Sequence, residues 1–234
     1  MAGSTTTKGP FIVALDQGTT GSTALVLDAR GRVCGRGYAE LPQHFPKPGW
    51  VEHDPDEIWD SVLTALKHAL AAARIQGAQV AAIGVTNQRE TVVLWDKRTG
   101  KPLGNAIVWQ DRRTSARCDE LRRKGKEAAI RRLTGLVCDP YFSASKLEWR
   151  FAHERSLRTL ATRGHLAFGT VDSWLVYKLT GGAVHATDPT NASRTMLYGL
   201  RSMRWEPSLL KTFGVPASVL PEVRRSAGDF GRTR

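Results

Sequence analysis

Residues 11–20 read FIVALDQGTT, and a second apolar run, ALVL at 24–27, follows almost at once. Two apolar runs joined by a short polar segment with a glycine predict a β-hairpin. Gly18 permits a backbone conformation with positive φ, and the turn amides and threonine hydroxyls supply the donors that an anion-binding turn needs. Asp16 would repel a phosphate unless a cation lay between them, so the stretch suggests Mg²⁺ as well as a nucleotide. An ordinary hairpin with a polar turn is the alternative interpretation.

The composition is that of a soluble globular protein with one large or two small domains. Of the 234 residues, 41% are hydrophobic and 24% charged, and no apolar stretch approaches the roughly 20 residues of a membrane span. Residues 1–10 are rich in Ser, Thr and Gly without an apolar core, which predicts a flexible tail and no signal peptide. Cys34, Cys118 and Cys138 form no CxxC pair, so we expect neither a zinc site nor a disulfide framework, and a reducing cytoplasm is the simplest location.

The formal net charge of +12 raises the alternative of nucleic-acid binding. Basic residues cluster at 122–126 and 131–132, but Asp119, Glu120 and Glu127 lie beside them at helical spacing, as on a solvated helix face. No zinc-finger, RNA-binding or basic-zipper pattern occurs in the sequence. Because net charge alone indicates solubility and nonspecific attraction, we expect no nucleic-acid partner and no membrane partner.

Hydrophobic periodicity predicts three strands, a helix and a fourth strand in the first third of the chain. We expect the first three strands at 11–17, 23–29 and 32–41. The helix has a clear start, because Asp54 can cap it, Pro55 suits the first helical position and Glu57 completes a capping box. It is expected to end at Gly77, and residues 80–85 predict a short strand buried in the interior of a sheet.

The rest of the chain alternates strand and helix patterns less regularly. Further strands are expected at 91–95, 106–109 and 166–170. Helices are expected at 114–124, 126–133, 143–154, 173–180 and 207–213. Asp172 can cap the fourth of these helices. Without repeats or an obvious linker, the pattern predicts an α/β fold in which antiparallel hairpins lead through a crossover helix to a parallel strand.

A polar cluster, TNQRET at 86–91, comes directly after the predicted strand 80–85. Ligands in open α/β sheets bind at the carboxyl ends of strands. Arg89 donates hydrogen bonds and Glu90 accepts them, so the pair can grip vicinal hydroxyls from both sides. Neighbours in a straight strand point in opposite directions, so the chain must turn or bulge here for both to face one ligand. A salt-bridged surface loop is the alternative.

Two aromatic residues would complete a small polyol pocket. Trp109 ends a predicted strand, and Tyr141 lies in the segment CDPYF at 138–142. An indole face packs against carbon, and a phenol adds a hydroxyl for hydrogen bonding. Taken singly, each ring is better explained by packing in the core than by contact with a ligand.

Together these features resemble the amino-terminal domain of the FGGY family of sugar kinases, and in particular its glycerol kinase branch. The matching segments, in order, are 14–20, 46–54, 86–91, 106–110, 139–143, 168–172 and 190–196. The resemblance covers roughly residues 11–230. Segment 46–54 and the loop with Arg89 and Glu90 separate the glycerol kinase branch from kinases of other sugars.

The resemblance implies an actin-like, ribonuclease-H-like ATPase domain over residues 11–234. Its sheet would be mixed and five-stranded, with antiparallel hairpins first and helices on both faces. The cofactors would be ATP and Mg²⁺, and glycerol would be phosphorylated to sn-glycerol 3-phosphate. Four residues would bind glycerol: Arg89, Glu90, Trp109 and Tyr141. Five residues of the first hairpin would contact the nucleotide phosphates: Gln17, Gly18, Thr19, Thr20 and Gly21. Asp16 would bind Mg²⁺ through water.

Three residues depart from the family pattern. The family often has Ser at the position of Gly21 and Arg at the position of Thr23, so a hydroxyl contact and a cation near the phosphates are lost. Arg150 stands where an apolar residue is expected, which we expect to affect packing. The resemblance places the Asp base and the second, carboxyl-terminal domain beyond Arg234, so no catalytic residue is predicted in this chain.

Three interpretations therefore stay open. The first is a glycerol kinase half that is incomplete for catalysis alone. The second is a non-catalytic remnant that binds a ligand or pairs with a partner, either a second copy or a separate carboxyl-terminal domain. The third is a kinase of another polyol or sugar.

Overall fold

The computed structural model describes residues 10–234, which form two compact units. Unit 1 comprises the described part of Met1–Pro42 together with Asp56–Gln88. Unit 2 comprises Gln43–Pro55 and Arg89–Arg234. The predicted tail, residues 1–10, lies outside the described residues except for Pro10. Within the described range, no helix combines the length and the apolar character needed to cross a membrane.

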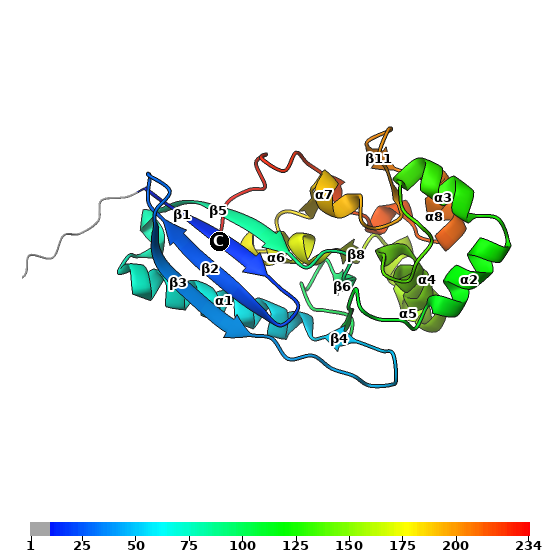
Figure 1. The fold of residues 1–234 in the computed structure, drawn as a ribbon, viewed down its shortest axis with the longest axis horizontal. Helices are drawn as coiled ribbons and strands as arrows, with labels where there is room; N and C mark the ends of the chain where they lie inside the picture. The colour runs from blue at the N-terminus through cyan, green and yellow to red at the C-terminus, as the bar shows by residue number, and fades with distance from the viewer. Residues whose placement is uncertain (1–9) are drawn as a thin grey trace, which may run out of the picture. The chain divides into compact units, whose positions relative to one another are not determined.

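Unit 1 is a mixed sheet with one long helix packed against it (Figure 1). The strands are β1 (Phe11–Gln17), β2 (Gly21–Leu27), β3 (Val33–Glu40) and β5 (Val80–Asn87), in the order β3-β2-β1-β5. The first three strands pair antiparallel, and β5 runs parallel to β1. The crossover between β3 and β5 carries α1 (Pro55–Ala73), which begins at Pro55 as predicted. Parallel pairing requires a crossover of this kind.

The core of unit 1 contains alternate side chains of β1 and the side chains on one face of α1. The buried side chains of β1 are Phe11, Val13 and Leu15. The buried side chains of α1 include Ile58, Val62, Ala65 and Ala69. Small residues let α1 approach the sheet closely, because a Cβ placed on Gly37 of β3 would lie 2.0 Å from the Ala65 carbonyl oxygen. Such a close approach of two backbones requires glycine at this position.

The prediction that residues 80–85 form a buried strand is wrong. Among the described residues, β5 pairs with β1 alone and therefore lies at the edge of the sheet. Its small residues Ala81, Ala82 and Gly84 are exposed. A run of small apolar residues resembles a buried strand in sequence, but the position of the strand in the sheet decides its burial.

Other details of unit 1 also differ from expectation. The sheet has four strands and not five, because β8 (Leu166–Gly169) pairs with β6 (Val93–Asp96) instead. Among the residues described for unit 1, α1 covers one face, whereas Ile12 on the opposite face is 49% exposed. The long helix ends at Ala73 and not at Gly77, which instead begins a short 3₁₀ turn.

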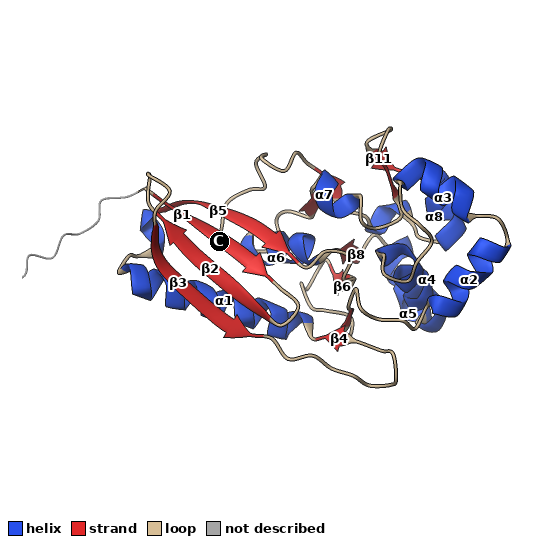
Figure 2. Cartoon of the chain, in the orientation of Figure 1, coloured by secondary structure: helices blue, strands red, loops and turns tan. Residues whose placement is uncertain are grey.

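Unit 2 consists mainly of short helices, and its strands occur in pairs (Figure 2). The helices are α2 (Ser115–Arg123), α3 (Glu127–Thr134), α4 (Ser143–His153), α5 (Arg155–Thr162), α6 (Val171–Leu179), α7 (Pro189–Ala192) and α8 (Pro207–Phe213). Besides β6 with β8, the paired strands are β4 (Glu52–His53) with β7 (Ala106–Ile107), β9 (Ala186–Thr187) with β12 (Glu222–Val223), and β10 (Tyr198–Gly199) with β11 (Arg204–Trp205). The pattern above did not anticipate α5.

Asp172 does not cap α6 as predicted. The helix begins at Val171 after Thr170, so Asp172 lies inside the first turn. Its carboxylate accepts hydrogen bonds from the hydroxyls of Thr170 and Thr187, the latter at 2.6 Å. Burial raises the pKa of Asp172 to about 6 despite these donors. The residue therefore joins α6 to β9 and leaves the capping position to its neighbour.

Arg150 departs from the family pattern in a way that the packing of unit 2 accommodates. Its guanidinium is buried and donates to the carbonyl oxygens of Leu103 and Asn105, the latter at 3.0 Å. It also donates to Glu154 at 2.9 Å. Arg150 therefore ties α4 to the loop before β7, where an apolar residue would leave carbonyls without a donor.

The close approach of α1 to β3 gives a stability prediction. Gly37→Ala should lower the free energy of unfolding by about 1–3 kcal/mol, because the new methyl group meets backbone atoms that cannot move aside. Gly84→Ala is the matched control, since a Cβ there meets no atom within 4 Å. Urea unfolding of the full chain measures both, and equal effects of the two substitutions would contradict this packing.

Candidate functional site

Glu90 occupies a sharp turn of the backbone in unit 2. The Thr91 amide donates to the Arg89 carbonyl oxygen at 2.7 Å, and Glu90 between them has a φ of 62°. A hydrogen bond between residues two apart around a positive φ defines the rare, strained form of the γ-turn. A residue other than glycine in such a conformation costs about 1–3 kcal/mol and persists only where its surroundings hold it. The chain thus makes the turn that the Arg89–Glu90 prediction required.

Two side chains hold Glu90 in this conformation. The Ser143 hydroxyl, at the start of α4, donates to the Glu90 carbonyl oxygen at 2.9 Å. The Arg194 Nε, just after α7, donates to the Glu90 Oε1 at 2.6 Å. The Glu90 side chain is only 3% exposed, whereas Arg89 is exposed. Among the described residues no group donates to the second carboxylate oxygen, Oε2, which is therefore left to accept from a ligand.

Trp109 and Tyr141 pack against each other in the same unit. Their ring centroids lie 5.2 Å apart with planes inclined at 55°, and both side chains are half-buried. The Trp109 amide donates to the Thr91 hydroxyl at 3.3 Å, which links this ring to the Glu90 turn. The Arg194 guanidinium carbon lies 5.8 Å from the Tyr141 ring centroid. Arg194 and Thr91 thus connect three of the four residues predicted to bind glycerol, and Arg89 adjoins Glu90 in the chain.

Arg113 contacts the segment 46–54, which is one of the segments that carry the family resemblance. Its guanidinium carbon lies 3.6 Å from the Trp50 ring centroid and 4.8 Å from that of Trp149 on α4. The same group pairs with Glu52 at 2.7 Å and with Asp111 at 2.8 Å. Asp111 is fully buried and also accepts from a backbone amide of the segment. This buried ion pair was missed from sequence, where WQDRR at 109–113 showed only that charges were present.

The first hairpin turn of unit 1 is closed by its own backbone. The Gly18 amide donates to the Gly21 carbonyl oxygen at 2.8 Å. Gly18 does not use the positive φ that glycine permits, so the turn does not depend on that freedom. The Gln17 side chain is buried, donates to the Gly18 carbonyl oxygen at 2.7 Å and accepts from Gln88 at 3.0 Å. Gln17 therefore supports the turn from inside, while Thr20 at its tip is exposed.

Gly21 has a steric reason for departing from the family pattern. A Cβ at this position would lie 2.5 Å from the Tyr38 Oη and 2.6 Å from the Ala39 carbonyl oxygen. The Tyr38 hydroxyl donates to the Thr20 carbonyl oxygen at 3.4 Å. The tyrosine thus fills the place beside the turn that a serine side chain would need. Only the backbone of Gly21 is available for a phosphate.

Asp16 meets the requirements of a metal ligand that acts through water. Its carboxylate is exposed, and its neighbours across the sheet are the uncharged Thr23 and Thr86. Within residues 10–234 no group of three His, Cys, Asp or Glu side chains is placed to hold a metal ion. A single carboxylate that leaves the remaining positions to water and phosphate oxygens is typical of Mg²⁺ bound with a nucleotide. These residues therefore fit the predicted ion.

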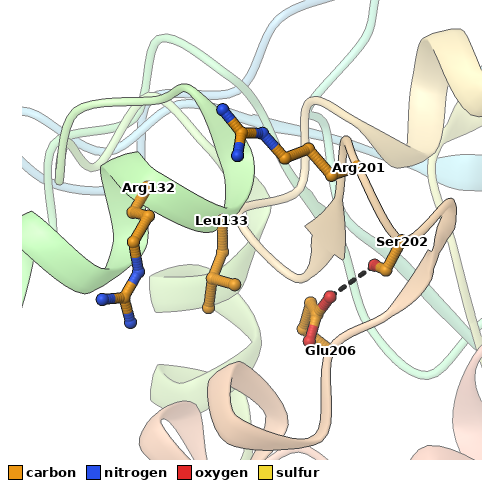
Figure 3. Close-up of a pocket in the computed structure, with 5 residues that line it drawn as sticks. All are labelled: Arg132, Leu133, Arg201, Ser202 and Glu206. Carbon is orange, nitrogen blue, oxygen red and sulfur yellow. Dashed lines mark hydrogen bonds between the residues drawn. The ribbon is translucent and has the colours of Figure 1, made fainter.

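A surface hollow of about 260 Å³ lies elsewhere in unit 2 (Figure 3). It is lined by Arg132, Leu133, Arg201, Ser202 and Glu206. Figure 3 shows the Ser202 hydroxyl directed at the Glu206 carboxylate, to which it is hydrogen-bonded. None of the residues predicted to bind substrate, phosphate or metal lines this hollow, so it adds nothing to the candidate site.

The fold and these residues together define a domain of the actin-like ATPase class. Residues 11–234 match the FGGY family of carbohydrate kinases, N-terminal domain. The chain belongs to this family.

Individual relatives agree with this assignment. The chain is 56% identical to a glycerol kinase of Rhodospirillum centenum, and the match covers 96% of this chain and 45% of that protein. A glycerol kinase of Alcanivorax borkumensis is 55% identical with the same coverage. The chain thus spans about half the length of these relatives. The crystal structure of Plasmodium falciparum glycerol kinase with ADP matches with a TM-score of 0.89 and 33% identity, over 96% of this chain and 45% of that one.

The buried ion pair of Arg113 gives a second stability prediction. Arg113→Met should lower the free energy of unfolding by about 3–5 kcal/mol, because Asp111 stays buried without its partner. Arg112→Met is the control, since Arg112 pairs with Asp139 at the surface and its loss should cost less than about 1 kcal/mol. Thermal and urea unfolding measure both, and a small effect of Arg113→Met would contradict the dependence of Asp111 on this partner.

Proposed function

We propose that this chain carries the glycerol-binding half of an ATP-dependent kinase that converts glycerol to sn-glycerol 3-phosphate. The observation that carries the proposal is the strained turn at Glu90, held by Ser143 and Arg194. Strain at a residue other than glycine is concentrated at functional sites, where the surroundings maintain it for a purpose. Here the strained residue is Glu90, whose carboxylate is buried, and its neighbour in sequence, Arg89, is exposed.

The four residues predicted to bind glycerol make different contacts with a small polyol. Arg89 donates to one hydroxyl, and the free oxygen of Glu90 accepts from the next. The Trp109 and Tyr141 rings pack against the carbon skeleton, and the phenol adds a polar contact. The matching of donors and acceptors to neighbouring hydroxyls favours a polyol over an apolar ligand.

The first hairpin turn contributes to nucleotide binding in this proposal. The Thr19 and Thr20 hydroxyls and the backbone of Gly21 contact the phosphates of ATP, while Gly18 closes the turn and Gln17 supports it from inside. Asp16 holds Mg²⁺ through water, and the bound ion supplies charge neutralisation for the transferring phosphoryl group. We assign no catalytic base to residues 10–234, and propose that it comes from a second domain or subunit of a cytoplasmic enzyme.

Glycerol binding tests the proposal directly. Glu90→Gln should weaken the affinity for glycerol about tenfold or more, because a hydrogen bond to a charged group is worth about 1.5–3 kcal/mol. Glu148→Gln is the matched control, since Glu148 also pairs with an arginine in unit 2 but was not predicted to bind substrate. Isothermal titration calorimetry of the chain with glycerol measures the affinities.

The same experiment distinguishes the alternatives. Tighter binding of five-carbon polyols than of glycerol would indicate a kinase of a larger substrate. Failure of the unaltered chain to bind any polyol would contradict the proposal. A parallel assay for sn-glycerol 3-phosphate with ATP and Mg²⁺ shows whether the chain needs a second part. Turnover at about 1–100 per second, the usual range of kinases, would mean that it supplies its own base.

A second candidate, a partner-binding role, is favoured by the open edge of β5. Edge strands are usually protected by charged residues, proline or bulges, but residues 80–87 read VAAIGVTN and contain no charge and no proline. Ala82 of this strand is exposed. Such an edge fits an added strand from a second copy or from another domain.

Self-association tests this second candidate. Sedimentation velocity at increasing concentration should show dimers, and Ala82→Lys should shift the equilibrium towards monomer by placing a charge at the edge. Thr64→Lys, on α1, is a control at a position that is exposed but not on the sheet. A chain that stays monomeric at every concentration would exclude pairing between copies.

A further inference from the structure

Lys146 is a fully buried cation in the first half of α4. Lysine is almost never fully buried unless its charge is paired. Among the described residues, however, Lys146 forms no ion pair with a carboxylate. Packing alone does not explain the residue, since an apolar side chain of similar length would fill the space without the cost of a buried charge.

The Lys146 ammonium group is instead satisfied by a single turn of the backbone. Its Nζ donates to the carbonyl oxygens of Pro140, Tyr141 and Phe142, the last two at 2.9 and 3.3 Å. An ammonium group has three donors, and these three consecutive carbonyls use all of them. The middle one belongs to the residue whose ring packs against Trp109.

The position of the charge adds to its cost. α4 begins at Ser143, so the ammonium group lies near the positive end of the helix dipole, where a cation is unfavourable. Burial and the helix dipole both make the charge of Lys146 unfavourable, yet the residue is present and its ammonium group holds the turn 140–142. Such an arrangement is typical of functional sites, where side chains must be held by groups behind them.

We infer that Lys146 is a positioning residue of the polyol site, whose ammonium group clamps the turn 140–142 and thereby fixes the Tyr141 ring against Trp109. Its importance for glycerol rests on the proposed function, but the clamp itself does not. The three hydrogen bonds of the Lys146 ammonium group are all to backbone carbonyl oxygens, and none is to a side chain predicted to bind glycerol.

The clamp should respond to pH. Burial lowers the pKa of Lys146 to about 7, although Asp111, Glu90, Asp139 and the Cys118 thiol face it and favour the charged form. The folded chain therefore loses this proton near pH 7, whereas the unfolded chain keeps it up to about pH 10.5. Because the unfolded state binds more protons across this window, the contribution of Lys146 to stability rises with pH while the clamp weakens.

The test compares Lys146→Met with the unaltered chain, and uses Lys211→Met, an exposed lysine of α8, as the control. Nuclear Overhauser effects between the Tyr141 and Trp109 rings report the position of the ring. Calorimetry reports the affinity for glycerol, and far-ultraviolet circular dichroism reports whether the variants are folded. The ring contacts of the unaltered chain are followed from pH 6 to 9.

We expect Lys146→Met to lose the contacts between the Tyr141 and Trp109 rings and to bind glycerol at least tenfold more weakly. Lys211→Met should change neither the ring contacts nor the affinity for glycerol. We also expect the ring contacts of the unaltered chain to weaken as the pH rises through 7, which decides the matter even if Lys146→Met fails to fold. Ring contacts that persist in folded Lys146→Met, or that ignore pH, would overturn the inference. If the ring contacts depend on Lys146 but the unaltered chain does not bind glycerol, the clamp is supported and the proposed function is rejected.

Discussion

The reversal of the backbone at Glu90 is the constraint on which the candidate site depends. Without it, Arg89 and Glu90 would point to opposite faces of a strand and could not meet one ligand. The turn carries a strain of about 1–3 kcal/mol in a residue that is not glycine. Ser143 holds its carbonyl and Arg194 holds its carboxylate, so helix α4 and the segment after α7 stabilise the same point.

Buried charges, in addition to an apolar core, hold the surroundings of this turn in unit 2. Arg113 packs against two tryptophan rings, and its charge is paired to Asp111 and Glu52. Lys146 lies behind Tyr141 with its donors on three carbonyls. Apolar contacts tolerate small displacements, whereas buried charges with directional partners do not, because a lost partner leaves the full desolvation cost. The proposed alignment of substrate hydroxyls would depend on such rigid support.

Features set by neighbours in sequence could be predicted, and features set by distant partners could not. The hairpin and the start of α1 at Pro55 follow from local patterns of alternation and capping. The prediction that β5 is buried was wrong, because burial of a strand depends on how many strands lie beside it. Arg194 lies in the matching segment 190–196, but its role could not be predicted. Its partner Glu90 lies 104 residues earlier, and only folding brings the two together.

The same difference between local and long-range contacts separates the residues predicted to contact phosphates from those predicted to bind glycerol. The turn predicted to contact phosphates is formed by local residues, and its hydrogen bonds would equally close an ordinary hairpin. The polyol set joins four separate segments through Arg194, Thr91 and Ser143. A polar turn needs only local residues, whereas the strained turn at Glu90 is held by an ion pair with Arg194, 104 residues away in sequence. The chemistry of this chain is therefore better identified from its long-range contacts than from the motif that first attracts attention.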